Sequence, residues 1–135
     1  MAGRRINDAM GRYFARELIK KMIHNTCTVK GSRVLVTGIT FKENVPDIRN
    51  SRVIDIIGEL SDFGILVDIW DPVACPDEVH REYGIELVDT PEEQSYDAVV
   101  MAVRHARFKD LGKQGLSRYL KGGGIFYDVK EALNS

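Results

Sequence analysis

The segment VLVTGITFKENVPDIRN, residues 34–50, is the clearest indication of the fold of this chain. It opens with a short apolar run, typical of a fully buried parallel strand, and then reaches Gly38. A dinucleotide-binding turn would continue with two more closely spaced glycines, and none follows here. Four other side chains come before any helix can start: Phe41, Lys42, Asp47 and Arg49. The segment predicts an α/β fold whose first loop is not an ordinary dinucleotide site.

Strand and helix patterns alternate after this segment. We expect helices at 51–64, 78–84 and 106–122, and further strands at 65–72, 85–90, 95–105 and 124–133. Ser51 is the expected N-cap of the first of these helices, and Gly64 ends it. Such alternation implies right-handed crossovers. The prediction is a Rossmann-like α/β fold, with a mainly parallel sheet and helices on both faces.

Residues 4–23, which precede the sheet, show the period of an amphipathic helix. An apolar residue recurs every four positions, at Ile6, Met10, Phe14, Leu18 and Met22. Residues 1–30 hold seven Lys or Arg against two acids, a net charge of +5, whereas residues 31–135 hold twelve against eighteen, a net charge of −6. Such a basic helix can lie on a membrane, but packing on its own protein is the commoner outcome.

Composition narrows the class of protein. The 135 residues suffice for one domain with a real core, and 44% hydrophobic with 29% charged residues is typical of soluble globular proteins. The net charge of −1 gives no overall reason to expect nucleic acid or an anionic membrane as a partner. The two cysteines, Cys27 and Cys75, lie far apart without metal-ligand spacing, which favours a reducing, cytoplasmic setting.

Ligands of open parallel sheets bind beyond the carboxyl ends of the strands. The sequence places 38–42, Asp71, 103–105 and 128–130 at those ends. Cations in the 34–50 loop, just before a helix N-terminus, would suit a diphosphate. The competing interpretation is a solvated loop in which Arg49 pairs with Asp47 or Glu43.

The joint spacing of several motifs carries a family resemblance. Gly38-x-x-Phe41-Lys42, Asp47-x-Arg49-x-Ser51 and Asp71-Pro72 together resemble the C-terminal domain of the UDP-glucose/GDP-mannose dehydrogenase family. The resemblance continues through AVVMAVRHARF and YDVK, while RRINDAMGRYFA looks like the end of the preceding central helical region. Within the family, GITFKEN with DIRN is most similar to the bacterial branch that oxidises UDP-N-acetylhexosamines for surface polysaccharides of Vi-antigen and O-antigen type.

This resemblance implies a multidomain enzyme. Family members combine an N-terminal NAD domain, a central helical dimerisation region and a C-terminal UDP-sugar-binding domain. They oxidise the C6 alcohol of the sugar to a carboxylate through a cysteine-bound intermediate. Residues 1–29 then correspond to the end of the central region and residues 30–135 to the UDP-sugar-binding domain. NAD would be bound mainly by the missing N-terminal domain, and the full-length enzyme would be a homodimer.

The chain by itself is expected to be inactive. It contains no G-x-G-x-x-G, and neither cysteine has the glycine-flanked setting of the family nucleophile. A different class of protein, a stand-alone regulatory module that binds a nucleotide or acyl-CoA, fits the same absences. We also expect the N-terminal helix, deprived of the rest of its region, to contact a second chain.

Site residues follow from the resemblance position by position. Phe41 and Lys42 match the family's Phe-Lys, which contacts the UDP-sugar, and Arg49 matches an arginine that faces the cofactor. Lys130 falls where many members carry a substrate-contacting arginine; lysine keeps that charge but loses the bidentate fork. Two nearby residues have both a functional and a structural interpretation: His105 could touch a phosphate or base, or cap the next helix or hydrogen-bond locally, and Trp70 could stack on uracil or lie in the core. The structural interpretation is the commoner one for both, and Asp71 is expected to form a turn.

Overall fold

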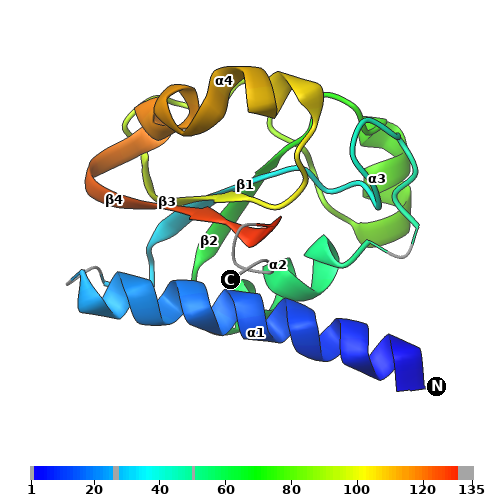
Figure 1. Cartoon of the computed structure of the whole chain (residues 1–135), viewed down its shortest axis with the longest axis horizontal. Helices are drawn as coiled ribbons and strands as arrows, with labels where there is room; N and C mark the ends of the chain where they lie inside the picture. Colours follow the sequence, from blue (N-terminus) through cyan, green and yellow to red (C-terminus); the bar gives the residue numbers. More distant parts are fainter. Residues whose placement is uncertain (1, 26–27, 50, 131–135) are drawn as a thin grey trace.

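A computed structural model describes residues 2–25, 28–49 and 51–130, with side chains from Met10 onward. Within these ranges the chain forms a parallel sheet with the strand order β2-β1-β3-β4 (Figure 1). The strands are β1 Arg33–Thr37, β2 Leu66–Trp70, β3 Tyr96–Met101 and β4 Leu120–Asp128. The predicted parallel sheet is therefore confirmed.

Helices cover both faces of this sheet, as expected for a Rossmann-like fold. They are α1 Ala2–His24, α2 Val53–Asp62, α3 Pro76–Tyr83 and α4 Ala106–Leu116, and a short 3₁₀ turn follows at Ser117–Tyr119. In Figure 1, α1 and α2 lie below the sheet, and α4 lies above it.

A separate apolar core fills each side of the sheet, because alternate strand residues point to opposite faces. The core towards α1 and α2 includes Leu18, Val34, Val36, Leu60 and Val100. The core towards α4 includes Leu35, Trp70, Val99, Phe108 and Leu116. Trp70 is buried, and its ring meets Phe108 edge-on at 5.1 Å, so the core role expected for this tryptophan is confirmed.

Two expected elements differ from the structure. No strand forms at 85–90, where Leu87 makes only an isolated parallel bridge to Ile69 at the edge of β2. The helix expected at 106–122 ends at Leu116, and the last strand already begins at Leu120. Within α4, the backbone of Gly112, at φ 64°, is not helical and kinks the helix four residues before its end. Apolar periodicity alone does not reveal that the helix ends at this point.

The N-terminal helix packs on its own domain. Phe14, Leu18 and Met22 are buried in the core shared with α2, so three members of the predicted stripe already have an intramolecular partner. Arg16 Nε lies 2.9 Å from Glu59 of α2, which links the basic segment to the acidic domain. The side chain of Ile6 lies outside the described set. Contact of this helix with a second chain stays a prediction. The main reason for expecting it was an exposed apolar stripe, and three residues of that stripe are buried within the chain.

Candidate functional site

The carboxyl ends of β1 and β3 meet at the switch point of the sheet. The chain runs from β1 to β2 on one side and from β3 to β4 on the other. Gly38, which follows β1, has φ +98°, and a Cβ added there would lie 2.6 Å from the Cβ of Val103. This glycine therefore permits close approach of the loops after β1 and β3, a packing role distinct from a pyrophosphate turn.

A pocket of about 510 Å³ opens at this switch point. It is lined by three connected segments: 41–44 after β1, 102–104 after β3, and Val129 with Lys130 after β4. The structure thus brings Phe41, Lys42 and Lys130 together around one cavity. Phe41 is 54% exposed, which is unusual for a large aromatic side chain and leaves its ring available to a ligand.

A second pocket, of about 430 Å³, adjoins the first on the side of α1. Phe41 and Lys42 line both pockets. Phe14 of α1 and Arg52 before α2 belong to the second pocket alone, which has a largely apolar lining. The Phe41-Lys42 dipeptide therefore borders both cavities.

The cations of the first pocket differ in their partners. Lys130 Nζ lies 3.2 Å from Glu43 Oε1, and an Arg104 guanidinium nitrogen lies 2.5 Å from Asp128 Oδ2. Among the described residues, no salt bridge engages the Lys42 ammonium, and its side chain is exposed. Lys42 is therefore the pocket cation that meets an incoming anion without first giving up a carboxylate.

A buried carboxylate fixes the backbone beneath the pocket. Asp71 Oδ2 accepts hydrogen bonds from the Ile39 amide at 2.7 Å and from His105 Nε2 at 3.0 Å. Its Oδ1 accepts from the amides of Val73 and Ala74 at 2.8 and 2.9 Å. Burial opposes ionisation of Asp71, but these hydrogen bonds outweigh it and lower its pKa. The expected turn-forming role fits this geometry.

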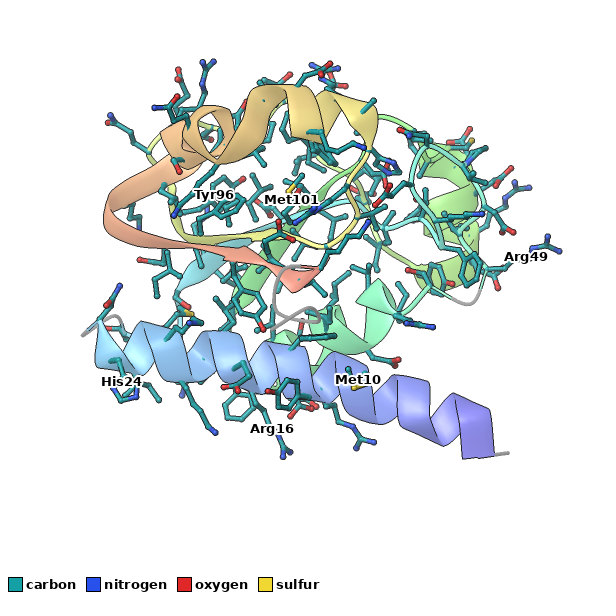
Figure 2. All side chains as sticks on the ribbon, in the orientation of Figure 1. Met10, Arg16, His24, Arg49, Tyr96 and Met101 are labelled. Carbon is teal, nitrogen blue, oxygen red and sulfur yellow. The ribbon has the colours of Figure 1, made fainter. Side chains whose placement is uncertain are left out.

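Arg49 lies apart from the two pockets that contain Lys42. Its Nε is 3.1 Å from Asp47 Oδ1, and Figure 2 shows its side chain pointing outward beside α3. The hydrogen bond and charge of Asp47 raise the pKa of Arg49, while the hydrogen bonds from Arg49 lower the pKa of Asp47. This is the pairing expected of a solvated loop. A role of Arg49 towards the cofactor stays a prediction.

The β1 loop does not suit NAD. Gly38 is followed by Ile39 and Thr40 where a dinucleotide turn needs further glycines, and the close contact with Val103 explains why position 38 has no side chain.

Cys75 is an exposed free thiol before α3, and Cys27 lies outside the described residues. Among the described side chains, no cluster of three or more His, Cys, Asp or Glu is suited to a metal ion.

Sequence reasoning did not assign Glu43 or Asn44 to the site. Asn44 has φ 62°; its amide donates to His105 Nδ1 at 2.9 Å, and its Oδ1 accepts from the Ala106 amide at 2.8 Å. Asparagine is enriched at left-handed backbone positions, so its place in the FKEN loop was a usable signal. The partners of Glu43 lie far along the chain and carry no such local signal.

Comparison with known proteins places this site in a family. The family model described as the UDP-binding domain of the UDP-glucose/GDP-mannose dehydrogenase family matches residues 35–135. A UDP-N-acetyl-D-glucosamine 6-dehydrogenase of Salmonella typhi is 47% identical over 98% of this chain, and one of Pseudomonas aeruginosa is 42% identical over 99%. The chain spans 31% and 32% of these proteins, so it covers about a third of their length.

Solved structures support the fold. A UDP-glucose dehydrogenase from Pyrobaculum islandicum matches with a TM-score of 0.68 at 23% identity, over 93% of this chain and 30% of that one. The UDP-N-acetyl-mannosamine dehydrogenase Cap5O of Staphylococcus aureus matches with a TM-score of 0.67 at 23% identity, over 98% of this chain and 33% of that one. These structures agree with the fold, while the family model that matches residues 35–135 shows that the chain belongs to the UDP-glucose/GDP-mannose dehydrogenase family and contains its UDP-binding domain.

Proposed function

We propose that this chain is the UDP-sugar-binding part of an NAD-dependent nucleotide-sugar 6-dehydrogenase. The complete enzyme oxidises the C6 alcohol of a UDP-N-acetylhexosamine, or of a UDP-hexose, to the uronic acid for surface polysaccharides. The relatives named as UDP-N-acetyl-D-glucosamine 6-dehydrogenases favour the hexosamine. NAD is bound mainly by a domain outside this chain, and the catalytic cysteine also lies outside it. The chain alone therefore does not turn over substrate.

The observation that carries this proposal is the placement of Lys42 and Lys130 around one cavity. They come from positions far apart in the chain, after β1 and after β4, and both line the 510 Å³ pocket. Ammonium groups held on opposite loops suit the oxygens of a diphosphate. The exposed ring of Phe41 adds a flat apolar surface for the nucleoside or the sugar.

The wider setting of the enzyme is part of the same proposal. It works in the cytoplasm, where its nucleotide-sugar substrate would be made, and as a homodimer. Tyr13 and Ile23, which are 53% and 59% exposed on α1, are apolar positions that a second subunit would cover. No helix in the described ranges is long and apolar enough to span a bilayer.

Isothermal calorimetry with UDP, NAD and coenzyme A tests the assignment. We expect the 135-residue chain to bind UDP weakly, because the rest of the enzyme's cleft is missing. Affinity for UDP should fall as NaCl is raised, since the lysines are exposed to solvent screening. Tighter binding of NAD than of UDP would overturn the proposal, and a preference for coenzyme A would favour the stand-alone regulatory module.

Replacing Glu43 with glutamine is expected to tighten UDP binding. Glu43 now holds Lys130 at 3.2 Å, so the phosphate must compete with a carboxylate for the same ammonium group. Because exposed ion pairs are weak, the gain should be only about two- to fivefold at low salt. Glu93→Gln removes the same charge at an exposed position in the loop before β3 and is the matched control. Weaker UDP binding by Glu43→Gln would show that Glu43 contacts the ligand itself.

A further inference from the structure

His105 is completely buried beneath residues 40–44, the pocket loop. Both of its ring nitrogens have partners on other segments. Nδ1 lies 2.9 Å from the backbone nitrogen of Asn44, while Nε2 lies 3.0 Å from Asp71 Oδ2 and 3.3 Å from Thr40 Oγ1. One imidazole therefore joins the end of β2, both ends of the 40–44 loop and the start of α4.

These contacts select one tautomer. A backbone N–H can only donate, so Nδ1 must present its lone pair to Asn44, and the ring proton must sit on Nε2. There it faces the Asp71 carboxylate, which can only accept, and the Thr40 oxygen. Thr40 donates its own hydroxyl proton to the carbonyl of Lys42 at 2.8 Å, so every polar atom in this cluster has a compatible partner.

The cluster fixes the backbone on both sides of Lys42. Before it, Thr40 connects His105 to the Lys42 carbonyl; after it, the Asn44 amide binds His105 and the Asn44 side chain binds the Ala106 amide. The Lys42 side chain itself is exposed. Its position over the pocket is therefore set by its backbone, and that backbone is held by His105.

We propose that His105 is the positioning residue of the pocket loop, holding residues 40–44 in the conformation that presents Lys42 to a nucleoside diphosphate. The inference rests on the proposed function for the ligand, but the geometry of the loop is independent of it. A purely packing role would be served by the contact with Asp71 alone. The second contact, from Nδ1 to the Asn44 amide, is the one that acts on the loop.

A pair of substitutions separates the two contacts of His105. A glutamine at 105 can place a donor near the Nε2 position and keep Asp71, whereas an asparagine can place an acceptor near the Nδ1 position and keep Asn44. We expect faster hydrogen exchange of the Asn44 amide in His105→Gln, and UDP binding weaker by about fivefold, the size of one lost hydrogen bond. His105→Asn should retain Asn44 protection and most of the UDP affinity, even where its thermal stability is lower.

Two further measurements test the inference even if the variants at position 105 do not fold. Nitrogen-15 spectroscopy of the wild-type ring should show the proton on Nε2. Thr40→Val, which is close to isosteric, should speed exchange around Lys42 and weaken UDP binding about two- to threefold, while leaving the contact between His105 and Asp71 in place. A proton on Nδ1, or equal Asn44 protection in wild type and His105→Gln, would overturn the inference. If the wild type does not bind UDP, the proposed function fails, and the exchange data still decide the role of His105.

Discussion

Replacing Asp71 with alanine is expected to lower the free energy of unfolding by about 3–5 kcal/mol. The buried carboxylate accepts hydrogen bonds from the amides of Ile39, Val73 and Ala74, and from His105. Alanine leaves these donors buried without an acceptor, and each such loss is costly. Thermal unfolding should show a drop in melting temperature of about 10–20 °C. Asp110→Ala, at an exposed position of α4, is the control and should change stability by less than about 0.5 kcal/mol.

The stability difference between wild type and Asp71→Ala should depend on pH. Because the folded state lowers the pKa of Asp71, its ionised form stabilises the protein above the ordinary value of 3.8. That contribution is lost as the pH falls through the folded pKa, so the stability difference between wild type and Asp71→Ala should shrink in acid. Asp71→Asn keeps the shape but turns an amide group towards backbone donors, so it should be destabilised as well. An unchanged melting temperature for Asp71→Asn would contradict the role given to the carboxylate.

The fold was predictable because its signals are local. The apolar run at β1 and the alternation after it predict buried parallel strands separated by helices, and these form. The strand expected at 85–90 was wrong, since a short apolar run at a sheet edge is also compatible with one bridge, here from Leu87 to Ile69. Helix α4 ends earlier than expected because the chain after Leu116 forms the 3₁₀ turn Ser117–Tyr119 and then β4, a change that residue periodicity does not encode.

The site was predictable only in part. Lys42 and Lys130 were placed at strand ends, and the parallel topology then brings them to one pocket. Arg49 shares a loop with Lys42, yet the structure turns it towards Asp47 and away from the pocket. Sequence proximity does not determine the direction of a side chain. Glu43 and Lys130 form an ion pair although they lie 87 positions apart in the sequence, so only the three-dimensional arrangement reveals it.

Replacing Lys42 with alanine is expected to weaken binding of UDP, or of a UDP-sugar, by about 1.5–3 kcal/mol, the range for a hydrogen bond to a charged group. This corresponds to roughly a ten- to hundredfold loss of affinity. Lys42 lines both pockets, and within the described residues no carboxylate pairs with it, so its charge is available to a phosphate. Calorimetry on the 135-residue chain measures the loss, and Lys113→Ala, at an exposed position of α4, removes an equal charge away from the site.

The fold should survive this substitution, because the Lys42 side chain is exposed and contributes no core contact. Its melting temperature should therefore stay close to that of wild type, in contrast to Asp71→Ala. In the complete enzyme, the loss should fall on the handling of the UDP-sugar, since Lys42 lies on the loop that we propose binds the diphosphate. The salt dependence of UDP binding should also become shallower, because one screened attraction has been removed. A collapse of thermal stability together with normal UDP affinity would show that Lys42 is a structural residue and that the phosphate site lies elsewhere.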